Sequence, residues 1–249
     1  MRSIIIMGMV YSLPATAQEY SPFSHLNVAL RASTLGGGIE LATPLNKHLK
    51  VRSGLDYFKY NVPYNNFSLS DDGGELYAAF GYVPDLRMKE EISFVHGHLL
   101  IDFHPVPKGI FHITAGAFVG TNRIHADGFL SDSNDDPAEL KSGYEWPSIV
   151  TDGREIDFSE GKSKVDILSE NTVKPYFGLG LGNAVTRHRI GFKFELGLLY
   201  QGDFSIEQNG QQIGTINGKG INNVDGFGEY IDLFKWWPVL GIQLTYRIF

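Results

Sequence analysis

Residues 189–201 read Arg-Ile-Gly-Phe-Lys-Phe-Glu-Leu-Gly-Leu-Leu-Tyr-Gln, and the alternation within this stretch decides the fold class. Every even position from Ile190 to Tyr200 is apolar, whereas Lys193 and Glu195 share the opposite parity. A period of two is that of a β-strand, whose successive side chains point to opposite faces. Burying both charges in an apolar medium would be costly. The stretch therefore predicts a strand with one apolar face and one polar face.

The same period recurs in four further stretches of the chain. They are residues 49–60, 91–104, 109–123 and 173–185. Strands in soluble proteins average about five to six residues, whereas a tilted strand that crosses a membrane needs about 9 to 11. The length of the alternating stretches therefore favours membrane strands. The alternative is a soluble exported β protein of lipocalin type, with its apolar faces turned inward around a ligand.

The N-terminal residues predict that the chain is exported. Arg2 precedes an apolar run from Ile4 to Leu13, and Ala15-Thr16-Ala17 supplies the small residues after which a signal peptidase cleaves. We expect residues 1–17 to form a cleaved signal peptide, with the cut between Ala17 and Gln18. The apolar run is too short for a spanning helix, which needs roughly 20 residues.

The C-terminal residues continue the alternation as far as Ile248, and the terminal Phe249 is out of phase with it. Leu240–Phe249 alternate apolar with small or polar residues and end on an aromatic side chain. With the leader and the alternating stretches, this ending resembles the small outer-membrane β-barrel proteins of Gram-negative bacteria. The resemblance implies an all-β fold for residues 18–249, a transmembrane antiparallel up-and-down β-barrel in the cell outer membrane. It also implies a monomer surrounded by outer-membrane lipid and lipopolysaccharide, which the barrel-assembly machinery inserts.

The connections between the alternating stretches differ in length, as in membrane barrels with short periplasmic turns and long extracellular loops. The long loops are expected near 61–90, 123–172 and 202–238. Both chain ends lie on the periplasmic side if residues 28–43 form two short strands that turn at Gly36-Gly37-Gly38, which gives eight strands. The alternative keeps 27–43 as one strand with a Gly bulge. It recruits a strand from 75–83 or from 203–217, and reaches eight or ten.

The segment from Asp225 to Trp237 departs from the strand pattern. Phe227, Tyr230, Ile231 and Phe234 have the spacing of a short amphipathic helix that would lead into the last strand. The following Trp236-Trp237-Pro238 is typical of an interfacial aromatic belt, where Trp is favoured at headgroup level.

Polar residues of several strands are expected to meet inside the barrel, where opposite charges such as Arg52 with Asp56, or Lys193 with Glu195, can pair. The predicted polar cluster of the lumen comprises Glu40, Arg52, Asp56, His98, Asp102, Lys193 and Glu195. An eight-stranded barrel has an interior just wide enough to be filled by side chains, which disfavours general porin activity. The net charge of −7 argues against a nucleic-acid partner, which requires a basic surface.

Three weaker patterns could carry chemistry. Asp132–Asp136 places oxygen ligands at alternate positions, as a calcium loop does, but Pro137 occupies the position that requires Gly. His96 and His98 share a strand face, with His112 as a third metal ligand. Ser24-His25 and His125-Ala126-Asp127 supply only ingredients of a hydrolase. We predict no catalytic residue, no metal site and no cofactor. The sequence does not identify ligand-binding residues.

The sequence therefore predicts an outer-membrane β-barrel protein with a structural, adhesive or ligand-binding role through its extracellular loops. The alternatives are a narrow passive channel for small solutes and an outer-membrane enzyme that modifies lipid A. A channel would need a continuous lumen path, and an enzyme would need polar side chains that meet at the lipid-facing rim.

Overall fold

The structure is a computed structural model that describes residues 22–151, 154–158, 160–186, 188–208, 210–216 and 235–249. The predicted signal peptide and its cleavage site lie outside these residues. The described chain is all-β apart from one short helix. In the same part of the chain, no helix is long and apolar enough to cross a membrane.

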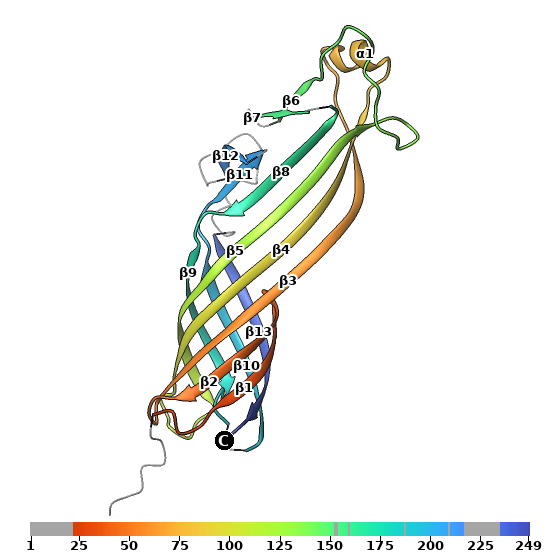
Figure 1. Ribbon diagram of the computed structural model, residues 1–249. Coiled ribbons are helices and arrows are strands. Elements are labelled where there is room, and N and C mark those ends of the chain that lie inside the picture. Colours follow the sequence, from red (N-terminus) through yellow and green to blue (C-terminus); the bar gives the residue numbers. More distant parts are fainter. Residues whose placement is uncertain (1–21, 152–153, 159, 187, 209, 217–234) are drawn as a thin grey trace, which may run out of the picture.

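A closed ring of antiparallel strands forms the lower part of the molecule (Figure 1). Along the ring, each strand pairs with the next, and the last, β9, pairs with the first, β5. Its eight members, in ring order, are β5 (Phe111–Ser131), β4 (Asp85–Phe103), β3 (Leu49–Ser68), β2 (Gly36–Pro44), β1 (Asn27–Ser33), β13 (Trp236–Arg247), β10 (Ile190–Tyr200) and β9 (Val173–Gly182). Ring closure leaves no free edge in this part of the sheet.

The outer wall of the ring is apolar. On β10, Phe192, Phe194 and Leu196 are between 48% and 75% exposed, whereas Lys193 and Glu195 between them are buried. The register carries this parity around the ring, because Phe194 lies opposite Ile242 and Lys193 lies opposite Gln243 of β13. The apolar faces therefore point outward, which contradicts a lipocalin-like interior and is the arrangement of a membrane barrel.

The first hairpin differs from the prediction in its turn. Thr34 and Leu35 connect β1 to β2, so Gly36-Gly37-Gly38 begins the second strand instead of forming the turn. Leu35 is completely buried and packs in an apolar cluster inside the barrel. Burial of this side chain holds the turn over the barrel interior. This is a tertiary contact, and the local preference of glycine for turns does not predict it.

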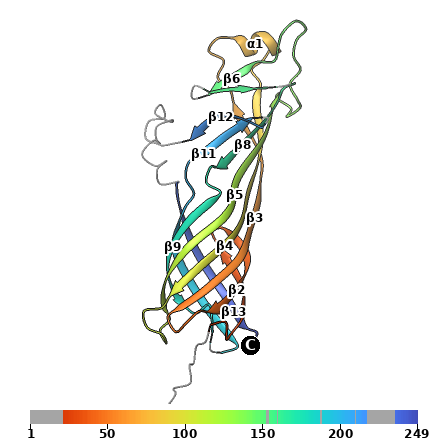
Figure 2. The same ribbon diagram turned by 60° about the vertical axis from the view of Figure 1, so that its left-hand side comes forward.

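The strands β3, β4 and β5 continue far beyond the ring, and the same sheet extends there through β8 (Lys162–Ser169), β11 (Phe204–Gln208) and β12 (Gln211–Ile216). We call this extension the blade; Figure 2 shows it rising from one side of the barrel. Between Val119 and Arg123, β5 exchanges its partner β9 for β8. Gly120 lies at this junction with a φ of +151°, and a Cβ there would lie 1.9 Å from the carbonyl oxygen of Val95.

The blade changes the interpretation of the three predicted long loops. Among the described residues of 61–90, 123–172 and 202–238, many lie in strands, because adjacent extensions satisfy one another's backbone hydrogen-bonding groups. The recruited segment 203–217 is the hairpin of β11 and β12, which lies outside the ring.

A small helix and a hairpin lie at the tip of the blade. The helix α1 (Glu75–Phe80) replaces the strand considered for 75–83. The Asp71 carboxylate accepts hydrogen bonds from the amides of Leu76 and Tyr77, at 3.0 and 2.8 Å, and so stabilises the start of the helix. The hairpin consists of β6 (Ser148–Thr151) and β7 (Arg154–Asp157). Leu76, Phe80, Leu130 and Phe158 share a buried apolar cluster, so the tip has a core of its own.

Most of the segment predicted as a helix, 225–237, lies outside the described residues. Its last three residues are described, and two of them contradict the prediction, because Trp236 and Trp237 are the first residues of β13. Trp236 points outward and packs against Tyr200 of β10, with ring centroids 4.9 Å apart.

Candidate functional site in the barrel lumen

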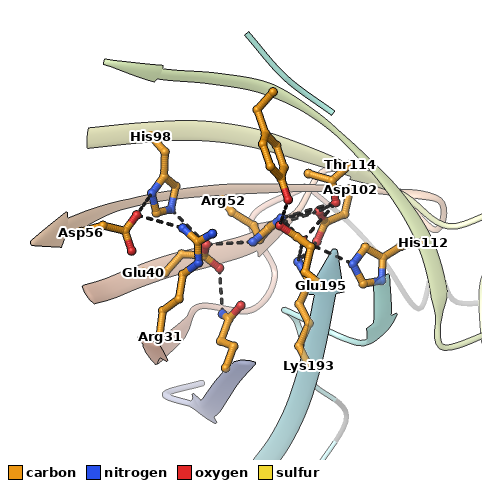
Figure 3. A network of polar contacts seen from close by, with 12 residues as sticks. Arg31, Glu40, Arg52, Asp56, His98, Asp102, His112, Thr114, Lys193 and Glu195 are labelled. Carbon is orange, nitrogen blue, oxygen red and sulfur yellow. Dashed lines mark hydrogen bonds and ion pairs between the residues drawn. The ribbon is translucent and has the colours of Figure 1, made fainter. Parts of the chain in front are cut away.

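Charged and polar side chains from several strands of the ring meet in the middle of the lumen (Figure 3). We call this set the lumen network; it consists of Arg31, Glu40, Arg52, Asp56, His98, Asp102, Thr114, Tyr176, Lys193, Glu195 and Gln243. Alternation along each strand points these residues inward.

Arg52 lies at the centre of the lumen network. Its guanidinium donates to Glu40 Oε2 at 2.9 Å, to Glu195 Oε2 at 2.6 Å and, through Nε, to Asp102 Oδ1 at 3.0 Å. The Arg52 side chain is 1% exposed, and the three carboxylates are at most 5% exposed. A planar group with five donors suits this task, because it can bind several carboxylates at once.

Lys193 binds two of these three carboxylates, those of Asp102 and Glu195. Its ammonium lies 3.0 Å from Asp102 Oδ2 and 2.7 Å from Glu195 Oε2. Thr114 donates to Asp102 at 2.7 Å, and the Tyr176 hydroxyl donates to the second oxygen of Glu195 at 2.7 Å. These contacts replace the water that the two buried carboxylates lose.

A second part of the lumen network surrounds Asp56. Arg31 donates to Asp56 Oδ2 at 2.8 Å. His98 lies between Asp56 and Glu40, with Nδ1 2.9 Å from one carboxylate and Nε2 3.0 Å from the other. An ionised carboxylate only accepts hydrogen bonds, so both ring nitrogens of His98 are placed to donate.

The charges of the lumen network balance when His98 carries both ring protons. The fixed cations are Arg31, Arg52 and Lys193; the carboxylates are those of Glu40, Asp56, Asp102 and Glu195. Three positive charges face four negative ones, and an imidazolium at His98 supplies the fourth cation. A balanced, hydrogen-bonded arrangement is the condition under which buried ion pairs are tolerated.

Glycines on the lumen face make room for the larger side chains of adjacent strands. A Cβ on Gly54 would lie 2.3 Å from the carbonyl oxygen of Ile39 and 2.8 Å from the ring of His98. The position directly opposite Gly54 on β4 is His98 itself. The absence of a side chain at Gly54 therefore leaves the space that the His98 ring occupies.

Substitution of Gly54 by alanine is expected to destabilise the barrel by about 1–3 kcal/mol, because the added methyl group overpacks the lumen. The matched control is Gly37→Ala, since a Cβ at Gly37 meets no atom within 4 Å. Urea unfolding of the two variants in lipid vesicles measures the difference, and equal midpoints would contradict the proposed role of Gly54.

All seven residues predicted for the polar cluster lie in the lumen network. The predicted pair of Lys193 with Glu195 is present. The pair of Arg52 with Asp56 was wrong: Asp56 binds Arg31, whereas Arg52 binds three other carboxylates. Arg31, Thr114, Tyr176 and Gln243 were missed, although each has the inward parity of its strand.

An apolar layer lies next to the lumen network and also crosses the barrel. It is formed by Leu35, Leu100, Phe118, Tyr176, Leu199 and Val239, all at most 3% exposed. Phe118 contacts both regions, because its ring lies 5.1 Å from the ring of His98 and 5.3 Å from that of Tyr176. The described residues therefore fill the lumen with an ionic layer and an apolar layer.

The lumen includes one group with the composition of a metal site, Asp102, His112 and Glu195, whose ligand atoms lie within 4.8 Å of one another. Arg52 and Lys193 already bind both carboxylates. A divalent cation would have to displace these charges, so the group fits a salt-bridge network better than a metal centre. His96 and His98 do not join this group, although both are buried.

Of the remaining candidates, Ser24-His25 lies just before β1, and the others lie in the blade. His125 is held by Asp166 at 2.7 Å and by Asp127 at 3.2 Å, which places two carboxylates around it rather than a nucleophile. Asp132 accepts hydrogen bonds from the amides of Asn134 and Asp136, at 2.8 and 3.0 Å. These amides hold the pKa of Asp132 below its usual value. The Asp132 carboxylate therefore stabilises its own turn.

A closed antiparallel ring with an apolar outer wall and a polar, ion-paired interior defines a transmembrane β-barrel with a filled lumen. Solved structures similar to this chain include CarO2 of Acinetobacter baumannii (16% identity, TM-score 0.49, 91% of this chain and 99% of that one). They also include CarO of Acinetobacter baumannii (14%, 0.47, 91% and 97%) and a major outer membrane protein from Thermus thermophilus (16%, 0.35, 90% and 99%). No family model and no curated protein sequence matches the chain.

Proposed function

We propose that this protein is a barrel of the Gram-negative outer membrane that anchors a binding or adhesive blade outside the cell, and that it is not an enzyme. The observation that carries the proposal is the blade itself. The strands β3, β4 and β5 extend past the ring, pair with β8 and β11, and end in a tip with its own apolar cluster. An ordered sheet of this kind presents a defined surface, which supports a recognition role.

The filled lumen supports anchoring over conduction. The lumen network and the apolar layer cross the barrel at two levels in the described part of the chain. A solute would have to separate buried ion pairs to pass, which is costly in a low-dielectric interior. We therefore expect the reconstituted protein to give no steady conductance in planar lipid bilayers, and a stable open level would favour the channel alternative instead.

The chain has no cysteine, so single cysteines can report which end faces outward. Ser133 is exposed in the blade, whereas Lys108 is exposed in the short turn between β4 and β5 at the opposite end. In intact cells, a maleimide too large to cross the outer membrane is expected to label Ser133→Cys but not Lys108→Cys. Permeabilising the membrane should then expose Lys108→Cys.

Two results would contradict the proposed function. Labelling of Lys108→Cys alone in intact cells would reverse the orientation. Identical gel mobility with and without boiling, together with solubility in buffer, would contradict the proposal that the protein is a membrane barrel.

A further inference from the structure

Lys174 is a buried cation without a carboxylate partner in the described part of the chain. It begins the lumen face of β9 and is 0% exposed. Its ammonium donates to the carbonyl oxygen of Gly120 at 2.6 Å, and no described carboxylate lies within ion-pairing distance. Arg31, Arg52 and Lys193 are buried as deeply, and each binds at least one carboxylate. An unpaired buried charge is strongly unfavourable, so Lys174 calls for an anion.

Other polar groups near Lys174 also lack partners. Within the described chain, neither ring nitrogen of His96 makes a hydrogen bond of regular geometry; its polar neighbour is the Asn122 side chain, whose Oδ1 has no such bond either. His96 lies directly opposite Gly120 in the sheet register, and the carbonyl of Gly120 is the group that Lys174 binds. His96 and Asn122 are at most 4% exposed. Buried polar groups are normally satisfied, so this group indicates a ligand that supplies acceptors and donors.

The surroundings on the blade side are apolar. Phe94 contacts Phe58 and Trp237, with ring centroids 5.5 Å apart in both pairs. One position further along the same inner face, Ile92 and Ile124 lie opposite one another and are half-buried. A ligand that reaches Lys174 from the blade therefore passes an aromatic and aliphatic wall.

We propose that the end of the lumen next to the blade binds an amphiphilic organic anion. Its carboxylate or phosphate head pairs with Lys174, and its apolar chain lies against Phe94, Ile92 and Ile124. The charge of Lys174, which pairs with no carboxylate among the described residues, favours an anionic head and disfavours cationic ligands. The apolar wall favours a ligand with an apolar chain, because only apolar surface gains free energy when it is buried against such a wall. The inference extends the proposed binding role to a chemical class of ligand.

The test is calorimetric titration in a neutral detergent, with protein-free micelles as the blank. The probes are octanoate, octyl phosphate, octanol and inorganic phosphate, so that head chemistry and chain are varied separately. We expect saturable binding of octanoate or octyl phosphate. The probe that binds more tightly shows whether the site prefers a carboxylate or a phosphate head. Octanol and inorganic phosphate should bind at least roughly tenfold more weakly, because each lacks one half of the recognition.

The variant Lys174→Met should weaken the binding of the anionic probe roughly tenfold or more. The matched control is Lys108→Met, an identical change at an exposed lysine in the turn between β4 and β5. The boiling-dependent gel shift checks that both variants fold. If Lys174→Met does not fold, the comparison of octanoate with octanol on the unmodified protein still decides.

Equal affinity of Lys174→Met and the unmodified protein would overturn the inference. Binding of octanol as tight as that of octanoate, or no saturable binding of either anion, would overturn it too. These outcomes leave the cysteine-labelling result unaffected, so failure of the ligand inference is distinguishable from failure of the proposed membrane orientation.

Discussion

Replacing Arg52 by methionine is expected to destabilise the folded barrel by about 3–5 kcal/mol, the cost of removing one partner from a buried ion-pair network. Three carboxylates, those of Glu40, Asp102 and Glu195, would lose their shared cation while staying buried. Methionine fills a similar volume, so the loss reports charge rather than a cavity. Urea unfolding in lipid vesicles, followed by tryptophan fluorescence, measures the change.

The control for this prediction is Arg123→Met in the blade. Arg123 also binds a carboxylate through two donors, Nε and Nη2, which lie 2.7 and 2.9 Å from Asp166. Its side chain is 46% exposed, and exposed pairs contribute about 0–1 kcal/mol. If both variants changed the unfolding free energy equally, burial of the lumen network would not explain its stability.

Substituting lysine for Leu196 is expected to cost about 2–4 kcal/mol, the penalty for a charge on the lipid face of a membrane barrel near mid-depth. Leu196 lies on the outer face of β10 between Phe194 and Leu198 and is 51% exposed. In water such a substitution on an exposed position would change little. The effect therefore depends on lipid around the wall.

Two controls separate the membrane from the substitution itself. Leu196→Met keeps the position apolar and should cost less than about 1.5 kcal/mol. Asn61→Lys adds the same charge to an exposed position on the blade, beyond the ring, and should be nearly neutral. Equal stability of Leu196→Lys and the unmodified protein in vesicles would contradict a lipid-facing wall at this height.

Much of the barrel was predictable because alternation is a local property of a strand. The stretch from Ile190 to Tyr200 contains both of its faces, and it forms β10 with the predicted parity. The predicted lumen residues follow for the same reason, since Lys193 and Glu195 must leave an apolar wall together. Arg31 was missed because β1 spans only Asn27–Ser33, and alternation over so short a strand carries little weight beside the longer stretches.

The blade was not predictable from the same signal. Residues 123–172 are rich in charges and lack sustained alternation, yet Arg123–Phe129 pair with Lys162–Leu168. Backbone hydrogen bonds stabilise these strands, and such bonds make no demand on side-chain pattern. The segment 75–83 lies in a predicted long loop, and only the alternative count makes it a strand, because Leu76, Ala78, Phe80 and Tyr82 alternate; the contact from Asp71 instead favours a helix at 75–80.

The sequence by itself determined the class of the protein: long strands with one apolar and one polar face require an apolar surrounding and a polar interior. The tertiary structure alone decided which strands close the ring, which carboxylates Arg52 binds, and that Lys174 faces the lumen with no carboxylate beside it among the described residues. Pairing partners lie far apart in the sequence, 203 residues for Gln243 and Glu40. Such contacts depend on ring closure and register, which no local pattern of residues specifies.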